Sequence, residues 1–214
     1  MNVEPLYGLR LRTPRLELRL ASRAELVELH ELARQGIHPP EEMPFENPWT
    51  DHAGEEDFVE RAVEFHETAL REWQPERWSF NLVTFLAGRP IGSQGMRAED
   101  FAAHRVVDTG SWLGEAFQRQ GLGTEMRAAV LELAFRELGA RAATSGSVFG
   151  NESSKRVSEK LGYTIVGTST IAPRGEPVQK YDLRIEREEW SSPFPVEIEG
   201  VDPCLPLFGV SGAS

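Results

Sequence analysis

The fold is decided by residues 110–138, GSWLGEAFQRQGLGTEMRAAVLELAFREL, in which a strand pattern leads through a glycine-containing loop into an amphipathic helix. The loop carries Gln118-x-x-Gly121-x-Gly123, and the helical pattern follows at once. The first amides of a helix have no partner within it and lie at the positive end of its dipole. The stretch therefore predicts a binding site for a phosphate or pyrophosphate group at the start of this helix.

The alternative is that Gly121 and Gly123 only make a tight turn between strand and helix, because short glycine patterns are common. The loop is not the dinucleotide fingerprint, which has the order Gly-x-Gly-x-x-Gly. It is not a P-loop either, since no Gly-Lys-Ser/Thr follows. A strand before the loop and a helix after it favour the phosphate site over a plain turn.

A second helix start lies at Asn151, in the stretch NESSKRVSEKLGY. Asn151 is a natural N-cap, which places Ser154 in the first turn. In an α/β sheet this helix and the previous one would open on the same edge, where ligands bind. Plain capping is the alternative for Asn151. Lys155 and Arg156 add positive charge that could meet a phosphate or simply be solvated.

Strand and helix patterns alternate along one continuous chain, which predicts a mixed α/β sheet of about seven strands with helices on both faces. Strands are expected over residues 13–20, 78–86, 90–97, 106–113, 142–149, 163–171 and 178–185. Helices are expected from a capping box at Ser22 to Gly36, over 55–73 and 124–138, and from Asn151 to Leu161. The helix over 55–73 presents one apolar stripe, made of Phe58, Ala62, Phe65, Ala69 and Trp73. Residues 1–190 are predicted to form one domain, and 191–214 a Pro/Gly-rich tail packed on that domain or on a partner.

Composition excludes several classes of protein. The formal net charge of −11 argues against a nucleic-acid or anionic-lipid partner. No apolar run is long enough to span a bilayer, and the first twelve residues lack the apolar core of a signal peptide. The single Cys204 excludes an internal disulfide and provides no metal cluster. These features predict a cytoplasmic protein without a structural metal.

The chain resembles the GNAT acyltransferase superfamily, and within it the Rim-like (ribosomal-protein alanine acetyltransferase) branch, over about residues 13–185. The resemblance rests on the order and spacing of short pieces rather than on any one of them. These pieces are Thr13-Pro14-Arg15-Leu16, Ile91-Gly92, Trp112-Leu113, Gln118-x-x-Gly121-x-Gly123-Thr124-Glu125, Asn151-x-x-Ser154 and Leu161-Gly162-Tyr163. The resemblance implies a mostly antiparallel GNAT-like sheet.

A closer resemblance is to an actinobacterial subgroup with Met43-Pro44-Phe45, Pro48-Trp49-Thr50 and the helix that begins Thr124-Glu125-Met126-Arg127. Some members of that subgroup look like users of succinyl-CoA rather than acetyl-CoA. The resemblance therefore leaves acetyl-CoA and succinyl-CoA both open as the acyl donor.

The resemblance implies an N-acyltransferase that moves the acyl group to a primary amine by direct attack in a ternary complex. Trp112 and Leu113 would offer backbone amides to the pantetheine and the thioester carbonyl. Asn151 would contact the pantetheine arm, and Ser154, the expected catalytic residue, would lie near the sulfur. The pyrophosphate would be held by Gln118, Arg119, Gln120, Gly121, Leu122, Gly123 and Thr124.

On the acceptor side, the stiff, proline-rich loop over residues 37–50 is expected to wall a pocket with Met43, Phe45 and Trp49, or else to plug the core beneath it. Gln94 is a candidate for orienting the acceptor. The candidates for a base are Glu46, Glu115 and His38, each with surface charge or a loop role as the alternative.

The acceptor is expected to be a small-molecule or peptide amine. The sequence also allows a catalytically weak acyl-CoA-binding sensor or structural protein on the same fold. A tRNA-modifying acyltransferase conflicts with the net charge. Cys204 lies far from the motifs and is not expected to act as a nucleophile. The apolar residues Leu205, Leu207 and Phe208 of the tail leave a homodimer possible.

Overall fold

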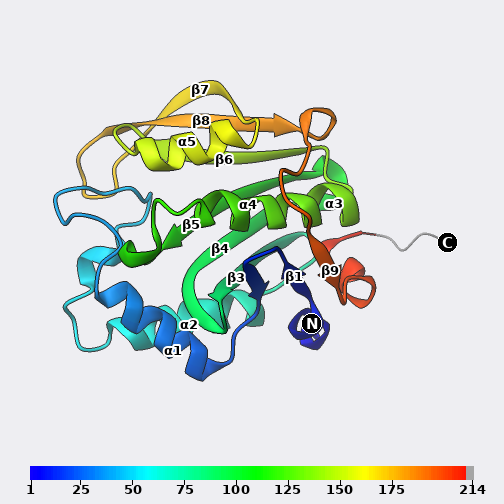
Figure 1. Ribbon diagram of the computed structural model, residues 1–214, viewed down its shortest axis with the longest axis horizontal. Helices are drawn as coiled ribbons and strands as arrows, with labels where there is room; N and C mark the ends of the chain where they lie inside the picture. Colours follow the sequence, from blue (N-terminus) through cyan, green and yellow to red (C-terminus); the bar gives the residue numbers. More distant parts are fainter. Residues whose placement is uncertain (211–214) are drawn as a thin grey trace.

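The structure, a computed structural model, describes residues 1–210. Within this range nine strands form one open sheet in the order β7-β8-β6-β5-β4-β3-β2-β1-β9 (Figure 1). All neighbours pair antiparallel except β5 and β6, which run parallel. The expected mixed, mostly antiparallel fold is thus confirmed. The strands are β1 (Arg10–Arg12), β2 (Leu16–Arg19), β3 (Arg77–Leu86), β4 (Arg89–Glu99), β5 (Val106–Leu113), β6 (Ala142–Val148), β7 (Thr164–Ile171), β8 (Val178–Glu186) and β9 (Glu197–Glu199).

The predicted count of seven strands is too low because two short strands, β1 and β9, escaped the pattern. Each has only three residues, too few for a period of two to be recognised. β9 pairs with β1, far away in sequence. The predicted strand over 13–20 starts too early, since residues 13–15 make the turn between β1 and β2.

The helices agree with the predicted order, and a short one, α3, is additional. α1 starts after Ser22 with the expected capping box, in which Ser22 and Glu25 bond reciprocally. α4 continues into a π-helical turn over Leu133–Glu137. No helix of residues 1–210 has the length and apolar character needed to cross a bilayer. The helices are α1 (Arg23–Arg34), α2 (Phe58–Arg71), α3 (Phe101–His104), α4 (Leu122–Glu132) and α5 (Glu152–Lys160).

The sheet buries an apolar core on each of its faces. Consecutive residues of β3 show this, because Leu82 packs in the core under α4 while Val83 packs with α1 and α2. The apolar stripe predicted for α2 is wrong at Phe65, which is 61% exposed. α2 instead buries a face rotated toward α1, made of Phe58, Val59, Val63 and His66.

The segment after β8 folds back along the edge of the sheet, where β9 pairs with β1, and packs against the core near Trp73. Trp190 donates its indole N–H to Glu132 of α4 (2.9 Å), and Trp73 donates to the carbonyl of Leu207 (2.8 Å). Cys204 and Phe208 are fully buried. Residues 211–214 of the predicted tail lie outside the described residues.

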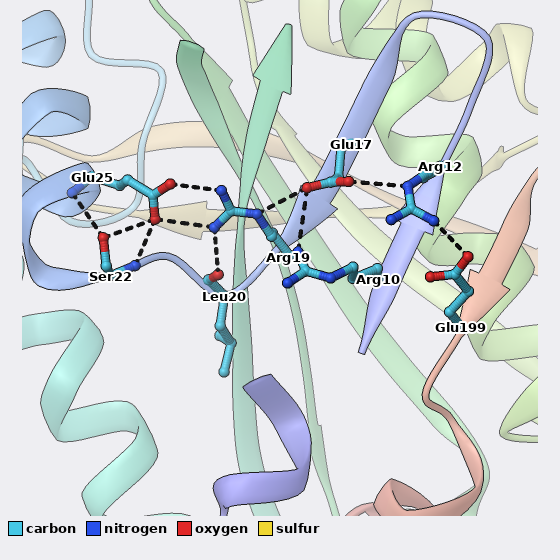
Figure 2. Close-up of polar contacts among 8 residues, drawn as sticks. All are labelled: Arg10, Arg12, Glu17, Arg19, Leu20, Ser22, Glu25 and Glu199. Atoms are coloured by element: carbon cyan, nitrogen blue, oxygen red, sulfur yellow. Dashed lines mark hydrogen bonds and ion pairs between the residues drawn. The ribbon is translucent and has the colours of Figure 1, made fainter. Parts of the chain in front are cut away.

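A chain of ion pairs crosses the edge of the sheet from β9 to α1 (Figure 2). Arg12 bridges Glu199 (2.6 Å) and Glu17 (3.0 Å), and Arg19 bridges Glu17 (2.9 Å) and Glu25 (2.6 Å). The Arg19 guanidinium also lies 3.9 Å from the centre of the Phe85 ring. This series of ion pairs therefore connects the short strands β9, β1 and β2 to helix α1.

Among the acidic residues of this series of ion pairs, Glu25 is the one whose protonation should change the free energy of unfolding most. Its hydrogen bond from Arg19 lowers the pKa of Glu25 from 4.5 to about 2. A lowered folded-state pKa stabilises the fold above the unfolded pKa, and that contribution is lost as pH falls from 4.5 through 2. Because the side chain is 30% exposed, we expect Glu25→Gln to cost about 2 kcal/mol at pH 7 after solvent screening. Urea unfolding should show this cost clearly smaller at pH 3, with exposed Glu28→Gln as control. A cost that is the same at both pH values contradicts the assignment.

Candidate functional site

The parallel strands β5 and β6 separate at their carboxyl ends. Their paired register runs from Val106–Ala142 to Thr109–Ser145, while β5 continues to Leu113 and β6 to Val148. Residues 110–113 of β5 and 146–148 of β6 are therefore not paired with one another. Trp112 and Leu113, both predicted site residues, lie on this part of β5, so the structure places them at the divergence.

Gly92 allows β4 to follow the end of β5 closely. A Cβ atom at Gly92 would lie 2.3 Å from the carbonyl oxygen of Trp112 and 2.8 Å from the Leu113 side chain. Any side chain at position 92 would therefore push the end of β5 away. This explains why a glycine stands in the Ile91-Gly92 piece of the sequence.

The predicted phosphate loop leads into an uncapped helix start. Gly121 is the N-cap of α4 at φ +79°, and no side chain bonds there. The first backbone bond of the helix runs from the amide of Glu125 to the carbonyl of Gly121 (3.1 Å). The amides of Leu122, Gly123 and Thr124 therefore have no acceptor within the helix. This donor set fits a pyrophosphate group.

Gly123 lies in the first turn of α4. A Cβ atom there would point toward Val157 of α5 (3.6 Å) and Leu113 of β5 (3.8 Å), both ordinary contact distances. The side of Gly123 thus faces the packing between α4, α5 and β5. An alanine would fit at these distances, so the packing alone does not require a glycine at position 123.

The two glutamines of the loop bond to the protein itself. The Gln118 amide donates to the carbonyls of Ile37 (2.6 Å) and Leu113 (2.9 Å), and so joins the loop over 37–50 to the end of β5. The Gln120 amide donates to the carbonyl of Ala116 (2.9 Å). These side chains shape the loop, and Arg119 between them is exposed at φ +59°.

Buried Glu125 and exposed Arg15 form a brace under the predicted phosphate loop that sequence reasoning missed. The Glu125 carboxylate is 1% exposed and accepts bonds from the Thr13 hydroxyl (2.6 Å), the Arg15 amide (3.0 Å) and the Arg15 guanidinium (2.6 Å). Arg15 also donates to the carbonyl of Gln120 (3.0 Å). The signal was present, because Thr13-Pro14-Arg15 and Thr124-Glu125 were both among the pieces of the resemblance.

α5 starts beside the divergence, with its predicted residues in place. The Asn151 side chain accepts the amide hydrogen of Ser154 (3.1 Å), so Asn151 caps the helix. The Ser147 hydroxyl of β6 donates to the carbonyl of Asn151 (3.0 Å). Ser154 is half-buried in the first turn. Lys155 is engaged with Glu159 (2.7 Å), while Arg156 is exposed.

Aromatic side chains gather at the end of β5 on the face covered by α1 and α2. Trp49 lies 5.6 Å from the rings of both Trp112 and Phe45, and stacks on Phe58 at 5.9 Å. His30 of α1 packs between Trp49 and Trp112, and burial lowers its pKa to about 3. The structure thus brings predicted residues Phe45 and Trp49 to Trp112.

Gln94 and Met43, the other two residues predicted to contact the acceptor substrate, do not belong to this aromatic cluster. Gln94 is fully buried on the α4 face of the sheet, where its amide donates to the carbonyls of Gly95 (3.0 Å) and Gly110 (3.1 Å). Met43 is half-buried in the loop and lies outside the ring contacts of the cluster. Alternate residues of a strand lie on the same face of the sheet, so Gln94 of β4 shares a face with buried Met96. This alternation could have shown from the sequence that Gln94 points into the core.

Each of the three candidate bases is engaged or lies at the surface. The His38 ring bonds through Nδ1–H to the carbonyl of Pro39 (2.8 Å) and through Nε2 to the Thr50 hydroxyl (2.8 Å). Glu46 forms an ion pair with Lys180 of β8. Glu115 is exposed beside the loop.

Two ion pairs connect residues 46–51 to the hairpin of β7 and β8, one from Arg174 in its turn and one from Lys180 of β8, and Figure 1 shows the two segments side by side. Arg174 bonds Asp51 (2.6 Å) and the carbonyl of Pro40 (2.9 Å), and Lys180 bonds Glu46. On the same face a groove of about 880 Å³ runs along α2 and the sheet, lined among others by Phe65, Arg97, Asp108 and Thr144. Its lining from β5 is Val106, Val107 and Asp108, at the opposite end of that strand from Trp112.

The uncapped start of α4, the parallel strands that diverge beside it and the capped start of α5 define an acyltransferase fold of the GNAT class. Residues 15–164 match the family of the acetyltransferase (GNAT) domain. The match covers most of the chain, and the protein belongs to this family.

Solved structures share the fold at low sequence identity. Mycobacterium smegmatis RimJ, in complex with CoA-disulfide, has a TM-score of 0.68 and 17% identity, covering 94% of this chain and 95% of its own. The ribosomal-protein-S5-alanine acetyltransferase of Vibrio fischeri has a TM-score of 0.64 and 14% identity, covering 85% and 98%. The microcin C7 self immunity acetyltransferase MccE, in complex with acetyl-CoA and AMP, has a TM-score of 0.66 and 17% identity, covering 81% and 93%. The resemblance to the GNAT superfamily is confirmed, and the Rim-like proteins among these solved structures share the fold.

Proposed function

We propose that this protein transfers an acetyl group from acetyl-CoA to a primary amine, by direct attack of the amine in a ternary complex. The observation that carries the proposal is the uncapped N-terminus of α4 beside the divergence of β5 and β6. RimJ and MccE, which share the fold, were solved with CoA-disulfide and with acetyl-CoA. Bound acetyl-CoA supplies the thioester carbonyl that the amine attacks.

The chain contributes binding, orientation and hydrogen bonds. The free amides of residues 122–124 hold the pyrophosphate, and the Arg15–Glu125 brace keeps their loop in shape. The free edge of β5 near Trp112 and Leu113 offers amides to the pantetheine and the carbonyl. Asn151 fixes the first turn of α5, from which the Ser154 hydroxyl donates to the departing sulfur. Holding both reactants together removes much of the entropic cost of the step.

A covalent acyl-enzyme has no support from the described residues. Cys204 is buried among core residues of the C-terminal segment, and burial raises the pKa of its thiol to about 11. A thiol with a raised pKa is a poor nucleophile at neutral pH. Direct attack by the amine is the route that remains.

Acetyl-CoA is the proposed donor, with succinyl-CoA as the alternative. A succinyl carboxylate needs a cation or several donors within the acyl pocket. The buried cation near the divergence is Arg127, and its guanidinium already donates to three serine hydroxyls. Its Nε–H still lacks an acceptor among the described residues, so the preference for acetyl-CoA rests on MccE, which shares the fold and was solved with acetyl-CoA.

The proposed acceptor is a weakly basic primary amine, such as the α-amine of a peptide or small molecule. A Lys side chain with a pKa of about 10.4 is neutral only about once in a thousand at pH 7.4, whereas an α-amine is neutral by tens of per cent. Since His38 and Glu46 are both engaged, the site suits an amine that is already neutral.

The test is CoA release by the wild-type chain and by Ser154→Ala, with acetyl-CoA or succinyl-CoA and a panel of α-amines and ε-amines. We expect release with acetyl-CoA and an α-amine, and a kcat about tenfold lower in Ser154→Ala with little change in KM, since only the leaving sulfur loses a donor. Calorimetric binding of acetyl-CoA without release by any amine would favour the alternative, an acyl-CoA-binding sensor on the same fold. Absence of binding would overturn both.

A further inference from the structure

Arg127 of α4 is a buried cation whose partners are all neutral. Its residue is 3% exposed, and its guanidinium donates to the hydroxyls of Ser158 (2.9 Å), Ser111 (3.0 Å) and Ser145 (3.4 Å). No carboxylate of residues 1–210 pairs with it, and its Nε–H has no acceptor there. Burial lowers the pKa of this guanidinium, the attraction of Asp108 and Tyr163 working against that effect.

Such an arrangement is costly for stability alone. Removing a charge from water is repaid only with good partners, and apolar residues of similar size are often as stable or more so. The exposed Arg136 of the next helical turns, by comparison, pairs with Glu132 (2.9 Å) and Glu137 (2.7 Å). A buried arginine with only hydroxyl partners therefore points to a purpose other than stability.

The three serines place Arg127 at the point where β5 and β6 separate. Ser145 belongs to the last pair of the two strands and donates to the carbonyl of its partner, Thr109 (2.9 Å). Ser111 lies two residues further along β5, on the diverging part. The Arg127 guanidinium therefore bonds to both β5 and β6 where the two strands separate.

The third serine connects Arg127 to the proposed catalytic turn. The Ser158 hydroxyl accepts from Arg127 and donates to the carbonyl of Ser154 (3.2 Å). Ser154 stands in the first turn of α5, capped by Asn151. Arg127 itself lies on α4, in the second turn after the phosphate loop, so it joins all the elements of the site.

We propose that Arg127 is a positioning residue of the acetyl-transfer site, holding the diverging ends of β5 and β6 and the first turn of α5 in their catalytic arrangement. The inference rests on the proposed function for its kinetic readout. It acts through Ser111 and Ser158, which separates it from residues that touch the substrate.

The experiment compares the wild-type chain with Arg127→Met, Arg127→Lys and Ser158→Ala, and uses Arg136→Met as the matched control. We expect Arg127→Met to lower kcat about 30-fold and to change the Kd for acetyl-CoA less than threefold, because the phosphate loop is braced separately by Glu125. Arg127→Lys should recover part of kcat, and Ser158→Ala should lose several-fold. Ser158→Ala added to Arg127→Met should cost little more, because the two side chains act together. Arg136→Met should match the wild type.

Hydrogen exchange on the same proteins gives a readout that does not depend on turnover. In Arg127→Met, amides of residues 110–113, 146–148 and 152–155 should exchange faster, while the rest of the sheet keeps its protection. Unchanged exchange in these segments overturns the inference even if no amine is accepted, and a wild-type kcat in Arg127→Met overturns it as well. A wild-type chain that binds acetyl-CoA but releases no CoA counts against the proposed function alone. If Arg127→Met does not fold, Ser158→Ala and Arg127→Lys carry the same test.

Discussion

Gly121→Val should lower the affinity for acetyl-CoA at least 100-fold while leaving most of the fold intact. Gly121 has φ +79°, where a residue with a Cβ costs about 1–2 kcal/mol and a β-branched one more. The chain can relieve this strain by turning the loop, which moves the amides of residues 122–124 away from the phosphate. Each charge-assisted hydrogen bond lost costs about 1.5–3 kcal/mol, so a loss of about 3 kcal/mol, or 100-fold, is expected. Calorimetry with acetyl-CoA and with free CoA measures it.

Gly123→Ala is the matched control two residues away. Its added methyl group meets Val157 and Leu113 at ordinary contact distances, and its position inside α4 suits alanine better than glycine. We expect wild-type affinity within about threefold and equal or higher stability. If Gly121→Val binds acetyl-CoA as tightly as Gly123→Ala does, the start of α4 is not the phosphate site, and the loop is only a turn.

Features that depend on neighbouring residues were predictable from the sequence. The capping box at Ser22, the N-cap at Asn151 and the strand-loop-helix around Gly121 are each written in a few consecutive residues. The mixed sheet followed from the alternation of strand and helix patterns. Local chemistry was therefore enough to predict the two helix starts at which we propose that the cofactor binds.

Features that depend on packing between distant segments were not predictable in the same way. Strands β1 and β9 are short and stabilise each other from opposite ends of the chain. Phe65 is apolar but exposed, because α2 turns Val59 and Val63 toward α1. Arg127 resembles a surface residue of an amphipathic helix, and only the packing of α5 beside α4 shows that it is buried.

The cofactor side and the acceptor side also differ in how the chain builds them. The phosphate loop is held by a buried carboxylate, a helix start and backbone bonds, all close in space. On the proposed acceptor side, the ion pairs Arg174–Asp51 and Lys180–Glu46 connect residues 46–51 to the hairpin of β7 and β8. Surface ion pairs contribute little to stability, typically below about 1 kcal/mol. The proposed cofactor site is thus firmly held, whereas the proposed acceptor entrance would open at low cost.

Glu125→Ala should be the most destabilising single change in the phosphate loop region, by about 3–5 kcal/mol. It removes the acceptor of the Thr13 hydroxyl and of the Arg15 amide and guanidinium, and a buried donor left without a partner costs about 1–3 kcal/mol. At about 2–4 °C per kcal/mol for a chain of this size, Tm should fall by roughly 6–20 °C. Calorimetric scans with and without acetyl-CoA measure the effect.

The same change should also weaken acetyl-CoA binding about tenfold, because Arg15 loses the partner that keeps it against the carbonyl of Gln120. Glu125→Gln, which keeps an acceptor for Thr13 and the Arg15 amide, should lose about half as much stability. Glu137→Ala, at the far end of the same helical segment, is the control and should leave binding unchanged. In the double variant Glu125→Ala with Arg15→Met, the two costs should not add, since both changes break one brace. Additive costs, or a wild-type affinity in Glu125→Ala, would mean that the brace stabilises the fold without shaping the phosphate loop.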